Sequence, residues 1–370
     1  MNISSIPYAF EGSVVSAVCL TGVLLIVAIS SLTTAKFDYK NKHVIITGGS
    51  SGIGLECAKV YLKKGANITI VARDKVKLAK AIEDLGALNH EGKRIMSVSV
   101  DTSKGQAAVI SAFAECLRES GPADVLVNCA GTSICKEFDQ LSTTDFEDMM
   151  RTNVLGSVYP TRAVIEGMKA TGSGRIVFVS SQVAQVALHG FTAYGASKWA
   201  LRGFAEALQM EVKPFGIIVS VAYPPDTKTP GYDHEMLSKP DITKKLSESG
   251  DVFSASVVAA DIVNYSTKGY FGISTGLDGW LLKQVHPTMS PITNIWEVAQ
   301  GIFFSPLCKF IALFYIISWD SMCHAKVKKE NKEKKEAEKV GAVKKVALPT
   351  TPAKDGVSMR VTRGSAKKAV

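Results

Sequence analysis

The chain lacks the cysteine patterns that stabilise small secreted domains or hold zinc. Its seven cysteines include no CxxC pair and no Cys/His group with the spacing of a zinc site. An odd, scattered set predicts reduced thiols in a domain that faces the cytosol, and it implies no structural metal. The seven positions are Cys19, Cys57, Cys116, Cys129, Cys135, Cys308 and Cys323.

The chain also has little excess charge outside one segment. Residues 326–370 contain 14 Lys or Arg and five Asp or Glu, so this segment alone carries the formal net charge of +9. The preceding residues are formally neutral, which argues against a basic nucleic-acid-binding face on the folded part. We therefore expect no nucleic-acid partner.

Residues 13–33 contain no charged side chain and are predominantly apolar. As a helix they would span about 31 Å, enough to cross a bilayer. The alternative is a cleaved signal peptide, but no Lys or Arg precedes the run, whereas Lys36, Lys40 and Lys42 follow it. The sequence predicts an uncleaved signal anchor, with residues 1–12 in the lumen and the chain after Lys36 in the cytosol.

Short runs rich in β-branched residues alternate with helical patterns from residue 42 to about 223. This rhythm predicts an α/β fold with a doubly wound parallel sheet, as in Rossmann-type domains, in a catalytic domain over residues 36–285. The expected strands are residues 43–47, 67–72, 95–100, 125–128, 175–179 and 217–222.

A second apolar run covers residues 301–319 and contains Pro306 and Lys309. A single crossing there would put the basic tail in the lumen, against the positive-inside rule. We therefore expect residues 286–324 to be membrane-associated, as a hairpin with the residues before them or lying in the interface. A buried core helix is the alternative.

The tail, residues 325–370, is rich in Lys, Glu, Ala and Pro. This composition predicts disorder apart from a helix near residues 327–340, and contact with anionic membrane lipids. The chain ends with Lys367 and Lys368 before two last residues, which resembles the cytosolic di-lysine signal for retrieval to the endoplasmic reticulum. We expect an endoplasmic reticulum membrane protein with its catalytic domain in the cytosol.

A glycine-rich segment directly follows the first expected strand and opens a helical pattern. Glycines there allow backbone N–H groups to approach a pyrophosphate, and the helix N-terminus favours an anion. Ser50 and Ser51 can donate to phosphate or ribose oxygens. The segment predicts a dinucleotide site and reads Thr47-Gly48-Gly49-Ser50-Ser51-Gly52-Ile53-Gly54.

The end of the second expected strand indicates which dinucleotide binds. Selectivity for NAD usually needs an acidic residue there, but Ala72 and Arg73 occupy this place. Arg73 and Lys77 can bind a 2′-phosphate, so the sequence predicts NADPH. The alternative is that both are solvated cations, with Asp74 as the ribose partner. Asp101, after the third strand, is placed to meet the adenine edge.

Tyr194 and Lys198 lie four residues apart at the start of a helical pattern, which puts them on one helix face. A phenol with a pKa of about 10 exchanges protons poorly at neutral pH. We expect the Lys198 ammonium to lower the pKa of Tyr194 and make the pair an acid/base catalyst. Ser181 follows the fifth strand and can hold the substrate oxygen; Ser180 would replace it if the register slipped by one.

In combination these motifs resemble the short-chain dehydrogenase/reductase superfamily, over residues 42–232. The resemblance implies that Asn153 braces a water relay to Lys198, that Asn128 stabilises the central sheet near the cofactor, and that Thr229 lies near the nicotinamide amide. Two features depart from the family pattern. Cys129 replaces the usual second Asn, and Pro224-Pro225 replaces the usual Pro-Gly.

Within the superfamily the closest resemblance is to the 3-ketodihydrosphingosine reductase family. It implies reduction of a long-chain lipid ketone, 3-ketodihydrosphingosine, with NADPH in sphingolipid synthesis. A membrane-bound steroid or retinoid oxidoreductase and a non-catalytic cofactor-binding scaffold are the alternatives, and the oligomeric state stays open. The residues that carry this resemblance are 128–131, 190–194, 223–227, 274–280 and 311–315.

Overall fold

The computed structural model describes residues 37–247, 250–285 and 295–346. The chain divides into two compact units, Met1–Trp319 and Asp320–Val370. The predicted signal anchor at residues 13–33 and the di-lysine end of the chain lie outside the described residues.

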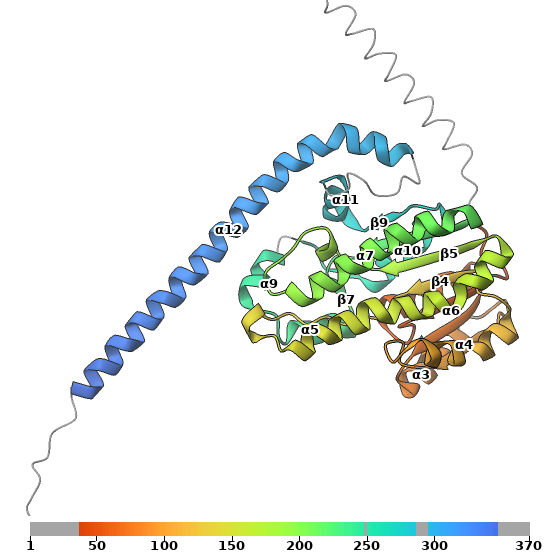
Figure 1. The fold of residues 1–370 in the computed structure, drawn as a ribbon, viewed down its shortest axis with the longest axis horizontal. Coiled ribbons are helices and arrows are strands. Elements are labelled where there is room, and N and C mark those ends of the chain that lie inside the picture. Colours follow the sequence, from red (N-terminus) through yellow and green to blue (C-terminus); the bar gives the residue numbers. More distant parts are fainter. Residues whose placement is uncertain (1–36, 248–249, 286–294, 347–370) are drawn as a thin grey trace, which may run out of the picture. The chain divides into compact units, whose positions relative to one another are not determined.

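A seven-stranded parallel sheet with the strand order β3-β2-β1-β4-β5-β6-β9 forms the centre of the first unit (Figure 1). The doubly wound parallel sheet is confirmed, and six of its strands lie within one residue of the predicted bounds. The seventh, β9, is only three residues long and was missed because it gives no periodic signal. The strands are β1 (His43–Thr47), β2 (Asn67–Ala72), β3 (Ile95–Ser99), β4 (Val125–Asn128), β5 (Gly174–Val179), β6 (Ile217–Tyr223) and β9 (Gly272–Ser274).

Three helices pack on each face of this sheet. On one face the side chains of α2 (Gly52–Lys63), α3 (Lys75–Gly86) and α10 (Ala255–Thr267) form one buried cluster with the strands. Because both faces are covered, the central strands are apolar throughout rather than alternating. The opposite face is covered by α4 (Gln106–Ser120), α6 (Gly156–Thr171) and α7 (Thr192–Val212).

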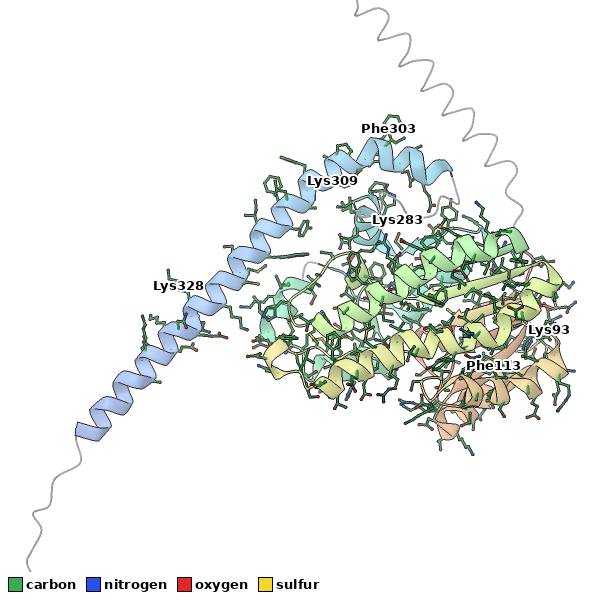
Figure 2. All side chains as sticks on the ribbon, in the orientation of Figure 1. Lys93, Phe113, Lys283, Phe303, Lys309 and Lys328 are labelled. Atoms are coloured by element: carbon green, nitrogen blue, oxygen red, sulfur yellow. The ribbon has the colours of Figure 1, made fainter. Side chains whose placement is uncertain are left out.

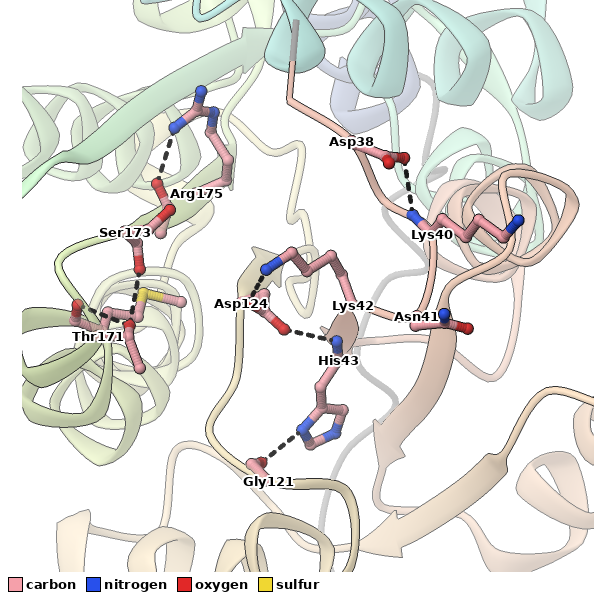
Figure 3. Close-up of polar contacts among 12 residues, drawn as sticks. Asp38, Lys40, Asn41, Lys42, His43, Gly121, Asp124, Thr171, Ser173 and Arg175 are labelled. Atoms are coloured by element: carbon pink, nitrogen blue, oxygen red, sulfur yellow. Dashed lines mark hydrogen bonds and ion pairs between the residues drawn. The ribbon is translucent and has the colours of Figure 1, made fainter.

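Polar contacts join the amino ends of the strands (Figure 3). The Asp124 carboxylate accepts from Lys42 Nζ at 3.0 Å and from the His43 backbone N–H at 2.9 Å. The His43 ring donates from Nδ1 to the Gly121 carbonyl at 2.9 Å. These contacts align β1 with the turn that precedes β4.

The second apolar run lies in one long helix, α12 (Ile295–Val346), which continues through Pro306. It follows α11 (Gly276–Val285), and Trp280 and Phe304 pack with ring centroids 5.4 Å apart. Residues Ala299–Ala337 are long and apolar enough to cross a membrane by length and composition, and only 6% of their apolar window is buried. The buried-core alternative is therefore wrong, whereas a membrane hairpin with the residues before the run stays a prediction.

The helix expected near residues 327–340 is confirmed as part of α12. Phe303 projects from α12 and is 59% exposed (Figure 2). Placement of this helix in a membrane interface stays a prediction.

Candidate active site

A cavity of about 1440 Å³ opens at the carboxyl ends of the central strands. It lies where β1 and β4 are neighbours and the strand order reverses, which is where doubly wound folds bind ligands. The volume exceeds the usual range for one drug-sized ligand, so the cavity has room for a dinucleotide and a second molecule. Twelve predicted site residues line it: Gly48, Ser50, Ser51, Gly52, Ile53, Arg73, Lys77, Asp101, Ser181, Tyr194, Lys198 and Thr229.

The glycine-rich segment joins β1 to α2 in a backbone path that side chains would block. Gly48 has φ +68°, and a Cβ there would lie 2.9 Å from the Ala130 backbone. A Cβ on Gly54 would collide with the Gly48 carbonyl oxygen. The first turn of α2 has no side-chain cap at Ser51, which leaves amides at this helix end for an anion. The segment therefore fits the pyrophosphate of a dinucleotide.

The end of β2 presents two cations to the cavity. Arg73 has a side chain that is 75% exposed and lies 3.8 Å from the Asp101 carboxylate. Asp74 caps α3, because its Oδ1 accepts from the Val76 and Lys77 backbone N–H groups at 2.9 and 3.0 Å. Asp74 also lines the cavity, so its place as the ribose partner stays open, while Arg73 and Lys77 are the groups there that can meet a phosphate.

Tyr194 lies in the first turn of α7, with Phe191 packed against its ring at 5.6 Å between centroids. Lys198, one turn later, has its Nζ 5.7 Å from the centroid of the Tyr194 ring and donates to the Val179 carbonyl at 2.9 Å. The structure thus brings the predicted tyrosine and lysine together at the end of β5.

Two adjacent serines follow β5 and make different contacts. Ser180 is buried, and its hydroxyl donates to the Lys198 backbone carbonyl at 3.2 Å. Ser181 lines the cavity, accepts from the Val183 N–H at 3.3 Å, and acts on the Tyr194 hydroxyl in the direction that lowers the pKa of Tyr194. The geometry therefore favours Ser181 as the serine that meets a substrate oxygen.

The expectation that Lys198 lowers the pKa of Tyr194 is wrong. Burial raises the pKa of Tyr194 well above its ordinary value, and the charges of Glu235 and Asp226 raise it further. Burial also lowers the pKa of Lys198 to about 8. Spacing along a helix showed that the two groups meet, but it could not show that desolvation exceeds their attraction.

Asn153 lies in a π-helical turn, Met150–Leu155, between α5 (Thr143–Met149) and α6. Its side chain accepts from the Thr132 N–H at 2.9 Å and donates to the Thr132 carbonyl at 3.0 Å. It also donates to the Ser197 hydroxyl at 2.9 Å, next to Lys198. Such turns often occur at functional sites. Asn153 thus braces the loop after β4 against α7 from behind the cavity wall.

Asn128 does not line the cavity but lies within the sheet, at the end of β4. Its side chain is buried and donates to the Thr161 hydroxyl at 3.1 Å. This contact ties β4 to α6, so Asn128 supports the sheet from within it.

The Pro-Pro loop after β6 leads to the helix α8 (Pro230–Met236). Thr229 caps this helix by accepting from the Tyr232 N–H at 3.1 Å. A Cβ added to Gly52 would lie 3.1 Å from Thr229 Cγ2, so the loop passes over the start of α2. Despite the departure from Pro-Gly, the loop still closes one side of the cavity.

Two parts of the cavity wall were missed from the sequence. One is an ionic cluster formed by Asp226, Glu235 and Lys239. The other is an apolar wall from α11 and α12, where side chains recur every four residues, a spacing that could have revealed it. The apolar wall contains Leu277, Leu281, Val285, Ile311, Tyr315 and Trp319.

Comparison with known proteins is consistent with this geometry. The chain is 47% identical to a 3-dehydrosphinganine reductase of Danio rerio, over 84% of this chain and 94% of that protein. It is 45% identical to a 3-ketodihydrosphingosine reductase of Bos taurus, over 81% of this chain and 91% of that protein.

Solved structures show the same fold. A short-chain dehydrogenase from Streptomyces avermitilis superposes with a TM-score of 0.56 and 27% identity, covering 65% of this chain and 90% of that chain. Levodione reductase superposes with a TM-score of 0.59 at 19% identity, covering 66% of this chain and 98% of that chain. The sequence pattern of the short chain dehydrogenases matches residues 42–237. The chain belongs to the short-chain dehydrogenase family.

Proposed function

We propose that the chain reduces the ketone of 3-ketodihydrosphingosine to the alcohol of dihydrosphingosine, with NADPH, in sphingolipid synthesis. The observation that carries this proposal is a single cavity that contains both a Tyr-Lys-Ser group and a long apolar wall. A ketone on a long alkyl chain matches both parts. The names of relatives at 45–47% identity support the same substrate.

The chemistry that the chain's own residues supply is proton transfer and positioning. Tyr194 and Ser181 hydrogen-bond to the ketone oxygen, and Tyr194 donates its proton as negative charge develops there. With its pKa above the ordinary value of about 10, Tyr194 is protonated at neutral pH and can act as the proton donor in the reductive direction. Lys198 stabilises the resulting phenolate, which regains a proton from solvent. A bound nicotinamide cofactor supplies the hydride, so one hydride and one proton convert ketone to alcohol.

Arg73 and Lys77 support the proposal of NADPH over NADH. Both line the cavity beside the end of β2, and Asp74, which follows Arg73 in the sequence, has one carboxylate oxygen engaged as a helix cap. A guanidinium and an ammonium can pair with the 2′-phosphate that distinguishes the two cofactors.

The exposed apolar surface of α12 supports a membrane location. Large side chains that would otherwise face water include Ile302, Phe303, Leu307, Phe310, Leu313, Phe314 and Ile317. Such a surface suits the apolar part of a bilayer, and a lipid substrate partitions into the same phase. We propose that the enzyme works at the cytosolic face of the endoplasmic reticulum membrane. In this proposal residues 13–33 anchor the chain, residues 36–285 form the catalytic domain, residues 286–324 associate with the membrane and residues 325–370 form the basic cytosolic tail.

Product analysis tests the function directly. The full chain in lipid vesicles is given 3-ketodihydrosphingosine, a ketosteroid or a retinal, each with NADPH or NADH. We expect dihydrosphingosine with NADPH, at a kcat/KM at least tenfold above that with NADH. Preference for the ring ketone or the retinal would refute the substrate, and no turnover of any carbonyl would indicate a non-catalytic scaffold.

A further inference from the structure

An unbalanced ionic cluster lies in the cavity wall. Lys239 Nζ is 3.2 Å from the Asp226 carboxylate and 3.4 Å from the Glu235 carboxylate, and its side chain is 1% exposed. All three residues line the cavity. Two carboxylates share one ammonium, so a count of formal charges gives the cluster one net negative charge. A partly buried net charge favours a ligand of opposite sign.

This cluster lies close to the reacting groups. Lys239 Nζ is 5.4 Å from the centroid of the Phe191 ring, and Phe191 packs directly on Tyr194. After burial, the Glu235 charge is the strongest influence that raises the pKa of Tyr194, and Asp226 acts in the same direction. A cation placed beside the two carboxylates would offset this effect and make Tyr194 a stronger proton donor.

A separate observation points to a ligand with hydrogen-bond donors. Gln185 lines the cavity at the end of the short helical turn that follows Ser181. The residue is 8% exposed, and its Oε1 atom is buried with no hydrogen-bond partner among the described residues. An unpaired buried acceptor destabilises the fold, and a ligand that donates a hydrogen bond to it would offset that cost.

We propose that Asp226 and Glu235 bind the protonated amine of the substrate, and that Gln185 accepts a hydrogen bond from the same head group. The inference rests on the proposed function, because the ketone of 3-ketodihydrosphingosine neighbours an amine. A carboxylate forms its strongest hydrogen bonds with a cationic donor, and it favours the protonated form of the amine. The apolar wall of α11 and α12 then takes the alkyl chain. The site would distinguish an amino ketone from a neutral lipid ketone.

The test compares two substrates that differ only in the amine: 3-ketodihydrosphingosine and the 1-hydroxy-3-ketone of the same chain length. The full chain is assayed in lipid vesicles with NADPH at neutral pH. We expect the wild type to prefer the amino ketone at least tenfold in kcat/KM. Glu235→Gln should reduce this preference about tenfold to hundredfold, the range expected when a hydrogen bond to a charged group is lost. Asp226→Asn should reduce it in the same direction.

Asp233→Asn is the matched control. Asp233 lies on the same helix α8, pairs with Lys228 with a side chain 56% exposed, and does not line the cavity. This variant removes the same charge and should leave the preference unchanged. Thermal unfolding of each variant checks that it folds.

The outcomes separate this inference from the proposed function. A wild type that reduces both ketones equally well overturns the amine site and leaves the reductase standing. The amine site is also overturned if Glu235→Gln lowers kcat/KM equally for both ketones. A wild type that reduces neither ketone refutes the proposed function itself.

Discussion

Two ionic clusters at opposite ends of the sheet use the same side-chain types in different proportions. At the amino ends, Asp124 pairs with Lys42, and both of its carboxylate oxygens are engaged. At the carboxyl ends, Asp226 and Glu235 share the single buried Lys239. The first cluster is balanced and fixes a turn, whereas the second leaves negative charge facing a cavity.

The difference shows how a structural cluster can be told from a binding cluster. In the first, each charge has a partner within the fold, so its contribution is to stability alone. In the second, the fold leaves a charge to be completed by another molecule. Each variant below changes a residue at one end of the sheet. Variants at the carboxyl ends should alter catalysis, whereas the variant at the amino ends should alter only the free energy of unfolding.

The largest effect is expected for Tyr194→Phe at the carboxyl end. Removing the proton donor should lower kcat/KM by about 10²–10⁴-fold, because general acid catalysis contributes that much. The free energy of unfolding should change by less than about 1.5 kcal/mol, since only one hydroxyl is removed and the ring keeps its packing against Phe191. Steady-state kinetics and chemical denaturation measure the two quantities. Tyr270→Phe, outside the cavity lining, is the control, and undiminished reduction by Tyr194→Phe would contradict the mechanism.

Lys198→Met should abolish most activity and yet stabilise the cofactor-free chain. The fall in the pKa of Lys198 from 10.5 to about 8 corresponds to about 3 kcal/mol of desolvation cost. Loss of the hydrogen bond to Val179 offsets part of this, so we expect a gain of about 1–3 kcal/mol at pH 7. Denaturant unfolding measures it.

The sign of the pH dependence follows from the lowered pKa of Lys198. Between pH 8 and 10.5 the unfolded wild type binds more protons at this lysine than the folded chain does, so this group's contribution to stability rises with pH. The advantage of Lys198→Met should therefore shrink across that window. An advantage that is constant or grows with pH would show that Lys198 is not desolvated as described.

The smallest effect is expected for Asp124→Asn at the amino end. The variant loses the ion pair with Lys42 and weakens the contact to the His43 N–H, so the free energy of unfolding should fall by about 1–2 kcal/mol. Substrate preference and kcat/KM should stay within twofold of wild type. Glu166→Gln, which breaks an exposed pair with Lys169, should cost less. A changed substrate preference in Asp124→Asn would contradict the claim that the cluster at the amino ends contributes to stability alone.

Much of the fold and part of the site could be predicted from the sequence. The strands up to β6 carry strong apolar patterns, and residues 47–54 combine glycines with a strand and a helix, so their placement follows from local chemistry. The spacing of Tyr194 and Lys198 likewise fixes their shared helix face. These features depend on neighbours in sequence, which a pattern can show.

The remaining features depend on contacts between distant segments. The short strand β9 has no pattern of its own, and Asp226 meets Lys239 only because the chain folds back through α8. The direction of the pKa shift of Tyr194 depends on burial, which spacing along one helix does not reveal.

The π-helical turn at Met150–Leu155 has a consequence for how the domain tolerates change. A π turn accommodates one residue more than the regular helix around it, and each residue advances an α-helix by about 100°. Asn153 lies inside this turn, and from there its amide bonds with Thr132 and Ser197. Deleting one residue of this turn before Asn153 would rotate the Asn153 side chain away from Thr132 and Ser197, although Asn153 itself would still be present.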